Sequence, residues 1–220
     1  QVRKSGVLAM KNDELTRIIV EEIITRETRT LVPVTISNRH VHIDEGTRRV
    51  LFGENPLTVK GFLGQPGEFA AEETVKVIGP KGHFDKVRIL GPERQFCQVE
   101  VSVGDCYHLG IKPTVRDSGQ LEGTPGVYLA GPCGVVQLKQ GVIVAKRHIH
   151  MIPADAKKYG VQNKQMVRIR YDSGFRRGIL GDVLIRVSEN YALECHLDIE
   201  EANALGIKNN DTVYLEMGGV

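Results

Sequence analysis

The chain has 220 residues, of which 41% are hydrophobic and 25% charged, and these proportions exclude an intrinsically disordered chain. Twenty-nine Lys and Arg against 27 Asp and Glu leave a formal net charge of +2, so no bulk field draws the protein to nucleic acid or to an anionic membrane. Twenty-four Gly, nine Pro and no Trp, with short Val- and Ile-rich runs, favour a mainly β fold of short strands joined by tight turns.

Neither a membrane span nor a secretory signal is visible. The longest uncharged stretch, residues 123–138, is broken by Gly and Pro and is too short for a membrane helix. No C-x-x-C pair occurs among the cysteines at 97, 106, 133 and 195, which predicts reduced thiols and a cytoplasmic location. The sequence begins with Gln1 rather than Met, so a targeting segment could precede it.

The first predicted element is an amphipathic helix over residues 13–27. Asn12 or Asp13 is its expected N-cap. Apolar side chains recur at helical spacing, namely Leu15, Ile18, Ile19, Ile23 and Ile24. Docking to a membrane or to a partner is an alternative, but the many charged residues of both signs favour a helix that lies on its own core.

After Pro33 the pattern changes to β. Period-two alternation or short apolar runs predict strands within residues 31–43, 74–79, 85–90, 98–103, 141–151, 165–171, 182–187 and 211–217.

Two internal repeats mark the candidate site. The tetrapeptide Arg-His-[Val/Ile]-His occurs at Arg39–His42 and again at Arg147–His150, each time after a strand-like run. A second unit, consisting of a helix, a Gly, an apolar residue, a polar loop and a strand, begins at Ala156 and again at Ala202. The segment HLGIKPTV is a shorter copy of this unit.

The glycines of this second unit set a register. The residues ten positions before Gly110, Gly160 and Gly206 are Glu100, His150 and His196, and His42 stands eleven before Gly53 in a looser fourth copy. If strand, capped helix and Gly turn form one structural unit, these residues lie at equivalent places, at the rim of a barrel. A β-barrel built twice, with ligands gathered at facing rims, is the simplest architecture.

Histidines in this pattern are candidate metal ligands. Residues i and i+2 of a strand point to one face, so both imidazoles of an H-x-H can reach one ion. A zinc site takes three or four protein ligands, so each pair needs a further donor, for which Glu100 and His196 are the candidates. Arg39 and Arg147 are either surface charges or hold an anionic ligand beside the metal.

Three other features are weaker. His83 and His108 have no partner pattern and are expected to be ordinary turn or surface histidines. Cys195 adjoins His196 on a strand, so it should point into a core while His196 faces the site. Neither a Walker A loop nor a strand followed by G-x-G-x-x-G is present, so no nucleotide fold is indicated.

The segments TISNRHVHI, KGFLGQPGEFAAEETVKVIGPKG, VRILGPERQFCQVEVS, AKRHIHM and ECHLD occur together and in order. With them the chain resembles the PduL-type phosphate propanoyltransferases, the phosphotransacylases of bacterial microcompartments, over residues 13–216. The resemblance implies two β-barrel domains capped by short α-helices. Their bounds would be 38–146 for the first barrel and 31–37 plus 147–220 for the second, after an N-terminal segment and amphipathic helix over 1–30.

The resemblance also implies the site. One zinc ion would be held by His40, His42 and Glu100, and a second by His148, His150 and His196, the six residues to which the register also points. Arg94 would bind phosphate and, with Glu100, serve catalysis. The predicted coenzyme A contacts are Ser37, Arg88, Leu90, His196 and Asn203.

The implied reaction converts acyl-CoA and phosphate into acyl phosphate and CoA, with propanoyl and acetyl groups both open. Direct transfer at two zinc ions is favoured over a covalent route through Cys97 or Cys195, because Cys195 and His196 diverge on their strand. Two rival functions are a dinuclear zinc hydrolase acting on a thioester or phosphoester, and a metal-stabilised binding module without activity. The resemblance further implies a homo-oligomer, at least a dimer, in a microcompartment lumen with shell or core proteins as possible partners.

Overall fold

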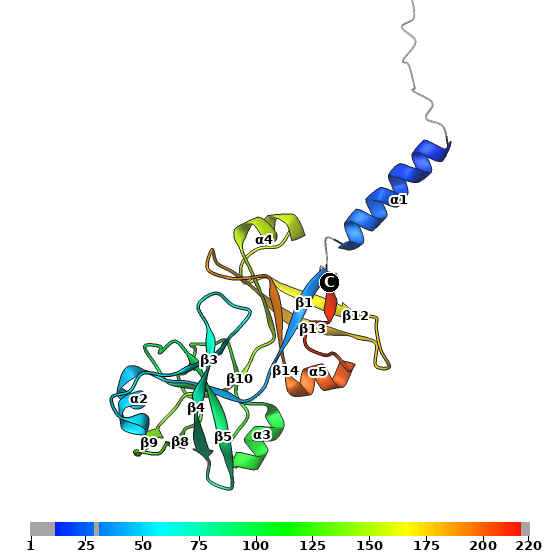
Figure 1. Cartoon of the computed structure of the whole chain (residues 1–220). Coiled ribbons are helices and arrows are strands. Elements are labelled where there is room, and N and C mark those ends of the chain that lie inside the picture. The colour runs from blue at the N-terminus through cyan, green and yellow to red at the C-terminus, as the bar shows by residue number, and fades with distance from the viewer. Residues whose placement is uncertain (1–11, 29–30, 217–220) are drawn as a thin grey trace, which may run out of the picture.

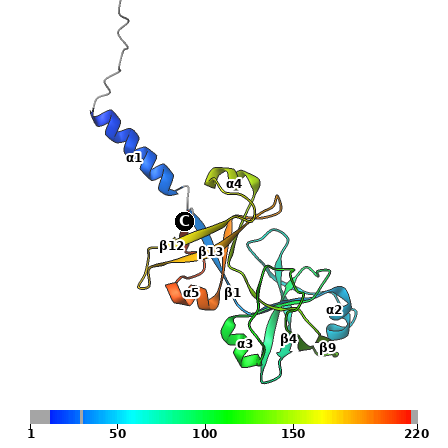
Figure 2. The same cartoon turned by 180° about the vertical axis from the view of Figure 1, so that it is seen from behind.

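A computed structural model describes residues 12–28 and 31–216. Most of the chain forms two β units that lie side by side, and one helix stands apart from both (Figures 1 and 2). Each unit has its own core of buried aliphatic side chains. The expected mainly β fold with helix-capped β units is therefore confirmed.

The C-terminal unit is a closed barrel of six strands in the order β1-β14-β11-β13-β12-β15. Its strands are β1 (Leu31–Ser37), β11 (His148–Met151), β12 (Met166–Tyr171), β13 (Gly178–Val187), β14 (Glu194–Asp198) and β15 (Thr212–Glu216). Strand β1 comes from far away in the sequence, yet it closes the barrel by pairing with β14 on one side and β15 on the other.

The N-terminal unit is a curled, half-barrel sheet of nine strands, in which β7-β10-β6-β2-β5-β4-β8-β9 follow one another and β3 pairs with β4. Its strands are β2 (His40–His42), β3 (Val59–Phe62), β4 (Phe69–Ile78), β5 (His83–Gly91), β6 (Gln98–Glu100), β7 (Val115–Arg116), β8 (Val127–Ala130), β9 (Val135–Leu138) and β10 (Val142–Ala145). This unit therefore curls toward a barrel without closing, whereas its neighbour closes.

Four short helices cap the two units: α2 (Glu45–Phe52), α3 (Val103–Leu109), α4 (Pro153–Tyr159) and α5 (Ile199–Leu205). Each follows a strand and ends at a Gly with positive φ, which a residue without Cβ adopts freely: Gly53, Gly110, Gly160 and Gly206. The predicted repeat of strand, helix and Gly is thus confirmed in all four copies.

Both Arg-His-x-His motifs lie where the chain crosses between units. Strand β1 belongs to the barrel and β2 to the N-terminal sheet, so the chain changes unit at Asn38 and Arg39. It returns between β10 and β11, at Lys146 and Arg147. The histidines that follow each crossing are therefore placed at the junction of the two units.

The N-terminal helix α1 (Asn12–Thr28) forms as predicted but does not lie on the core. It projects from the body in both views (Figures 1 and 2). Its apolar residues Leu15, Ile18, Ile19 and Ile23 are 45–53% exposed. The expectation that it covers its own core is wrong, because amphipathic spacing does not say what a helix packs against. The side chains of Asn12, Asp13 and Ile24 lie outside the described residues.

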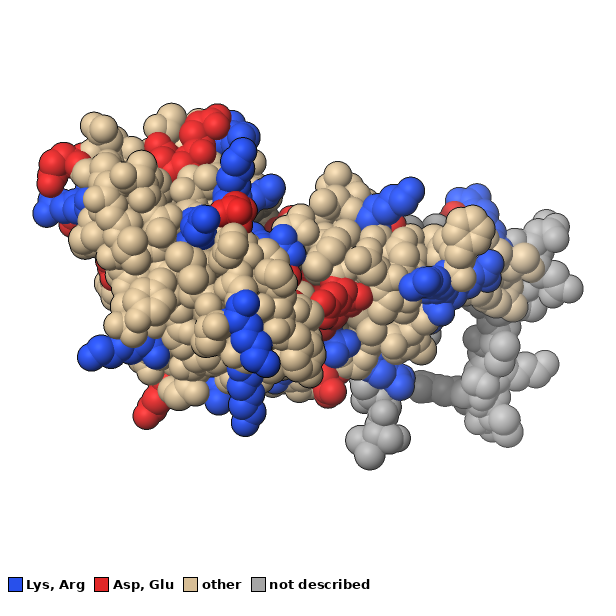
Figure 3. All heavy atoms as spheres, turned by 90° about the horizontal axis from the view of Figure 1, so that it is seen from below, with Lys and Arg blue, Asp and Glu red and all other residues tan. Residues whose placement is uncertain are grey.

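In the part of the chain that the structure describes, no helix has the length and apolarity needed to cross a membrane. Lys and Arg as well as Asp and Glu are scattered over the face drawn in Figure 3, separated by uncharged surface. This face therefore carries charges of both signs.

Candidate metal and substrate site

The N-terminal cluster is built from two short antiparallel strands. His40 and His42 lie on β2, and His40 pairs in register with Glu100 on β6. The Nε2 atoms of His40 and His42 are 3.5 Å and 3.9 Å from the two carboxylate oxygens of Glu100. The Nδ1 atoms lie 2.9 Å from the carbonyl oxygen of Asn38 and 3.2 Å from that of Leu90, which can only accept. Both imidazoles therefore turn Nε2 toward the carboxylate.

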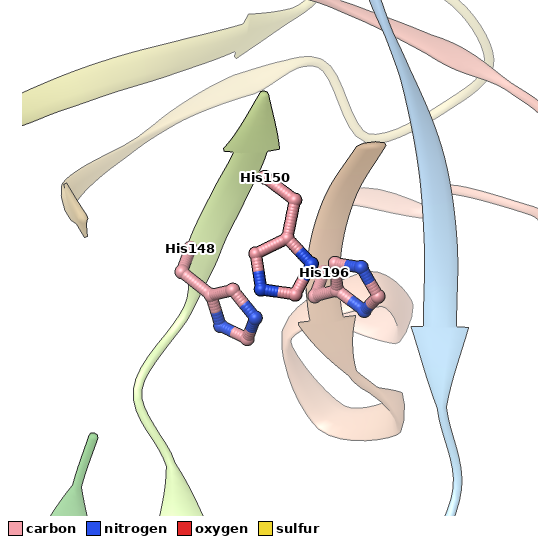
Figure 4. Close-up of side chains that lie close together, drawn as sticks. All are labelled: His148, His150 and His196. Atoms are coloured by element: carbon pink, nitrogen blue, oxygen red, sulfur yellow. The ribbon is translucent and has the colours of Figure 1, made fainter. Parts of the chain in front are cut away.

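The C-terminal cluster repeats this arrangement. His148 and His150 lie on β11, and His148 pairs in register with His196 on the antiparallel strand β14. The three rings point toward one another (Figure 4), with centroids 4.6–4.8 Å apart. Nδ1 of His148 lies 2.7 Å from the carbonyl oxygen of Lys146, and Nδ1 of His40 likewise lies 2.9 Å from that of Asn38.

The chemistry of both clusters fits a metal ion. In each group the three candidate ligand atoms lie within 4.8 Å of one another. Both ring nitrogens of His150 and Nε2 of His196 are buried and have no hydrogen-bond partner among the described residues. Leaving such atoms unpaired in a protein interior is costly unless a ligand takes them up. Imidazole nitrogens, alone or with a carboxylate oxygen, are ligands that zinc prefers.

The imidazoles are poised as neutral ligands. Burial, with a contribution from neighbouring imidazoles, lowers the pKa of His42 and of His148 to about 3 and that of His150 to about 2. His40 is the exception: burial would lower its pKa too, but the carboxylate of Glu100 and the carbonyl of Asn38 together raise it. Burial would raise the pKa of Glu100, but the facing imidazoles lower it well below its usual range, so Glu100 stays ionised.

Both clusters face one cavity of about 420 Å³ between the β units. Arg94 lines it and is held there by Glu68, whose Oε1 is 3.1 Å from Nη2, and by the Ser118 hydroxyl at 3.4 Å from Nη1. A guanidinium in this position can bind an anion in two-point fashion once its bond to Glu68 is exchanged.

Four of the five predicted coenzyme A contacts line the cavity, and the fifth does not. Ser37, Arg88, Leu90 and His196 line the cavity. Asn203 lies on α5, is exposed and is not among the lining residues; its backbone carbonyl accepts a bond from Arg176 instead. Arg39 and Arg147 do not line the cavity either, so they are not placed to hold an anionic ligand in it.

Sequence reasoning missed three lining or supporting residues. Glu194 stands two residues before His196 on the same strand face, with Oε2 3.0 Å from Nε2 of His196 but off the direction of its N–H bond. Gln98 stands two residues before Glu100 and donates to its carboxylate at 2.6 Å. Arg186 lines the cavity beside its register partner His150. Period-two spacing on the strands could have identified the first two.

Glu194 joins the two units. Its carboxylate accepts bonds from the hydroxyl of Thr35 on β1 and, at 2.7 Å, from the amide of Gln65 in the N-terminal unit. Burial would raise the pKa of Glu194, but the neighbouring His196 imidazole and the bonds from Thr35 and Gln65 lower it to about 2.

The two cysteines considered for a covalent route, Cys97 and Cys195, are unsuited to nucleophilic catalysis. Cys195 is completely buried in the barrel core, as predicted, while His196 on the next position faces the cavity. Burial raises the pKa of both Cys195 and Cys97, so neither thiol ionises readily.

Comparison with known proteins points to one family. A family model described as phosphate propanoyltransferase matches residues 33–208. The chain is 50% identical over 197 residues to a phosphate propanoyltransferase of Thermotoga maritima, covering 89% of this chain and 93% of that protein. It is 52% identical over 185 residues to one from Rhodopseudomonas palustris (84% and 81% covered) and 43% identical over 196 residues to one from Salmonella typhimurium (89% and 93% covered).

Proposed function

Because this chain belongs to the phosphate propanoyltransferase family, we propose that its cavity transfers the acyl group of a short-chain acyl-CoA directly to inorganic phosphate. The observation that carries the proposal is that two three-ligand groups and Arg94 face the same cavity. Acyl-CoA, phosphate and two zinc ions per chain are the expected ligands.

The reaction forms a C–O bond between a phosphate oxygen and the thioester carbonyl carbon and breaks the C–S bond, so that CoA leaves as a thiolate and is protonated by solvent. Such a site must hold an anionic nucleophile and stabilise an oxyanion. Zinc bound at the two clusters would supply Lewis-acid chemistry for both tasks.

The residues of the chain have separate roles in this proposal. Arg94 holds phosphate, and the ionised Glu100 serves the N-terminal zinc together with His40 and His42. His148, His150 and His196 serve the other ion. Ser37, Arg88, Leu90 and His196 orient CoA in the cavity, and Asn203 would contact CoA outside it.

Direct transfer is favoured over a covalent acyl-enzyme. The raised thiol pKa values of Cys97 and Cys195 leave little thiolate to accept the acyl group. Cys195 also has no exposed surface through which it could reach a substrate.

The test combines metal content with a CoA-release assay on purified chain. We expect about two zinc ions per chain and release of CoA thiol from propanoyl-CoA only when phosphate is present. A zinc hydrolase would instead release CoA without phosphate. A metal-free preparation with full activity would refute the metal-dependent mechanism.

Three further assignments are part of the proposal. The two β units are two domains, 38–146 and 31–37 plus 147–220, preceded by segment 1–30. The enzyme is at least a dimer, and it works in the lumen of a bacterial microcompartment, in propanediol degradation, with shell or core proteins as partners. Sedimentation of the full chain tests the oligomer, and fractionation of intact microcompartments tests the location.

A further inference from the structure

Each arginine of the repeated motif pairs with a carboxylate that has no role in the proposed reaction. Arg39 directly precedes His40, and Arg147 directly precedes His148. Arg39 spans both carboxylate oxygens of Asp105, with Nη2 at 2.7 Å and Nε at 3.1 Å. Arg147 places Nε 2.9 Å from Oε1 of Glu201.

These two carboxylates occupy equivalent positions in the two units. Asp105 lies five residues after the ligand Glu100, and Glu201 lies five residues after the ligand His196. Each also closes a capping box in the first turn of the helix that follows that ligand strand. The capping bonds therefore hold the carboxylate at the start of α3 or α5 independently of the arginine.

In each unit the arginine thus connects the strand carrying the first two ligands with the helix start that follows the third ligand. The strand pairing alone is short, since β2 and β6 have three residues each, and β11 and β14 have four and five. A metal site tolerates little displacement of its ligands, so a second connection between the two strands has a purpose.

The connection is stronger in the N-terminal unit. Asp105 is nearly buried, with 9% of its side chain exposed, whereas 20% of Glu201 is exposed. The guanidinium of Arg39 also lies over the ring of Phe84, with Cζ 4.1 Å from the centroid. Among the described residues Arg147 makes one ion pair, with Glu201, and the strands of its cluster are longer.

We propose that Arg39 and Arg147 are positioning residues, each of which holds together the three metal ligands of its own unit through Asp105 or Glu201. The inference rests on the proposed metal-dependent function and assigns a role that is confined to one cluster per arginine.

The test measures metal affinity at each cluster separately. The full chain is stripped with a chelator and titrated with Co²⁺, whose visible absorption reports binding, and His40→Ala and His148→Ala assign each binding event to its cluster. We expect Arg39→Ala to weaken Co²⁺ binding at the N-terminal cluster by about 10- to 100-fold and leave the other unchanged. Arg147→Ala should do the reverse, with a loss toward the lower end.

Conservative variants separate positioning from charge. Arg39→Lys keeps the charge beside Asp105 and guards against misfolding, but an ammonium cannot span both oxygens, so it should still weaken the N-terminal cluster. Arg147→Lys can replace its single contact and should retain binding. Arg170→Ala is the matched control. Arg170 pairs with Glu216 at 2.6 Å in the barrel that also contains the cluster of Arg147, but it belongs to neither cluster.

The outcomes are distinct. Unchanged affinities in Arg39→Ala and Arg147→Ala, equal weakening of both clusters by either variant, or the same loss in Arg170→Ala would each overturn the positioning role. Wild-type chain that binds no Co²⁺ would overturn the metal centre, and this role with it. Thermal unfolding of the metal-free variants verifies that they are folded.

Discussion

The two β units hold their clusters on the same strand frame. In the N-terminal unit β2 runs antiparallel to β6 and parallel to β5, and in the barrel β11 runs antiparallel to β14 and parallel to β13. The registers correspond, since His40 faces Glu100 as His148 faces His196. One open sheet and one closed barrel therefore present the two histidines of the same motif to one cavity.

The units differ in where they place charge. Strands β6 and β14 each carry the third candidate ligand of their cluster. On β6, Gln98 stands two positions before the candidate ligand Glu100, and on β14, Glu194 stands two positions before the candidate ligand His196. Each of these pairs of positions holds one carboxylate, which is itself a candidate ligand in the N-terminal unit and the neighbour of a candidate ligand in the barrel. The comparison indicates that the strand frame fixes the positions of the candidate ligands, while the side chains exchanged on it set the charge of each cluster.

The largest effects should come from removing one ligand in either unit. We expect His40→Ala and His148→Ala each to lose about one zinc per chain and to lower kcat/KM about 1000-fold or more, equivalent to ~4 kcal/mol of lost Lewis-acid stabilisation. Zinc analysis and the CoA-release assay measure both quantities. If one variant loses both ions, or keeps full activity, the two clusters are not the independent sites that the comparison describes.

The next effect concerns the arginines on the two sides of the cavity. Arg94→Ala should lower kcat/KM for phosphate by about 2–4 kcal/mol, because a two-point guanidinium contact is lost. Arg186→Ala should cost less, because Arg186 lies over Tyr191 at 5.7 Å and faces the other cluster. Initial rates against phosphate concentration compare them. Equal losses would place the phosphate between the units rather than on the N-terminal side.

The histidines of the two clusters should contribute differently to the loss of folding stability as the pH falls. Burial lowers the pKa of His148 to about 3, below the ordinary value of the unfolded chain, so the unfolded state takes up a proton first as pH falls. The free energy of unfolding of the metal-free chain therefore has its full value, with respect to His148, above about pH 6.5. It decreases by up to ~1.4 kcal/mol per pH unit as the pH falls from there toward the folded pKa. The raised pKa of His40 acts in the opposite sense: its contribution is present below the unfolded value and is lost as pH rises.

The variant His148→Asn tests this sign. Its side-chain amide can still donate to the Lys146 carbonyl but cannot be protonated. Urea unfolding of metal-free protein should show that the variant loses less stability than wild type between pH 7 and pH 5. An equal loss in both proteins would contradict the shifted pKa of His148.

The sequence predicted which candidate ligands the fold brings together in each cluster because their signal is local. An H-x-H pair on a strand, and a ligand ten residues before a helix-ending Gly, both follow from short-range geometry that the four helix caps reproduce. Pairing partners are not local. Arg39 and Asp105 are 66 residues apart, and nothing in the Arg-His-x-His motif indicates which carboxylate the arginine meets.

Two parts of the fold also lacked a signal. Residues 31–43 read as one continuous strand, but the chain changes sheet at Asn38 and Arg39, which hydrophobic alternation does not mark. Strands β3, β7, β8 and β9 are two to four residues long, too short for a period to emerge.

The smallest effect on catalysis should come from α1. Because its apolar side chains are about half exposed and the helix projects from the body, its removal uncovers neither β core (Figure 1). We expect a chain starting at residue 29 to keep its thermal unfolding temperature, zinc content and kcat/KM within about twofold, and to associate less, because an exposed apolar stripe is gone. Leu15→Lys with Ile19→Lys, which keeps the helix but removes the stripe, is the control and should reduce association to a similar extent. Aggregation of the truncated chain would mean that α1 covers apolar surface of the β units in solution, and would restore the core-packing expectation drawn from its amphipathic spacing.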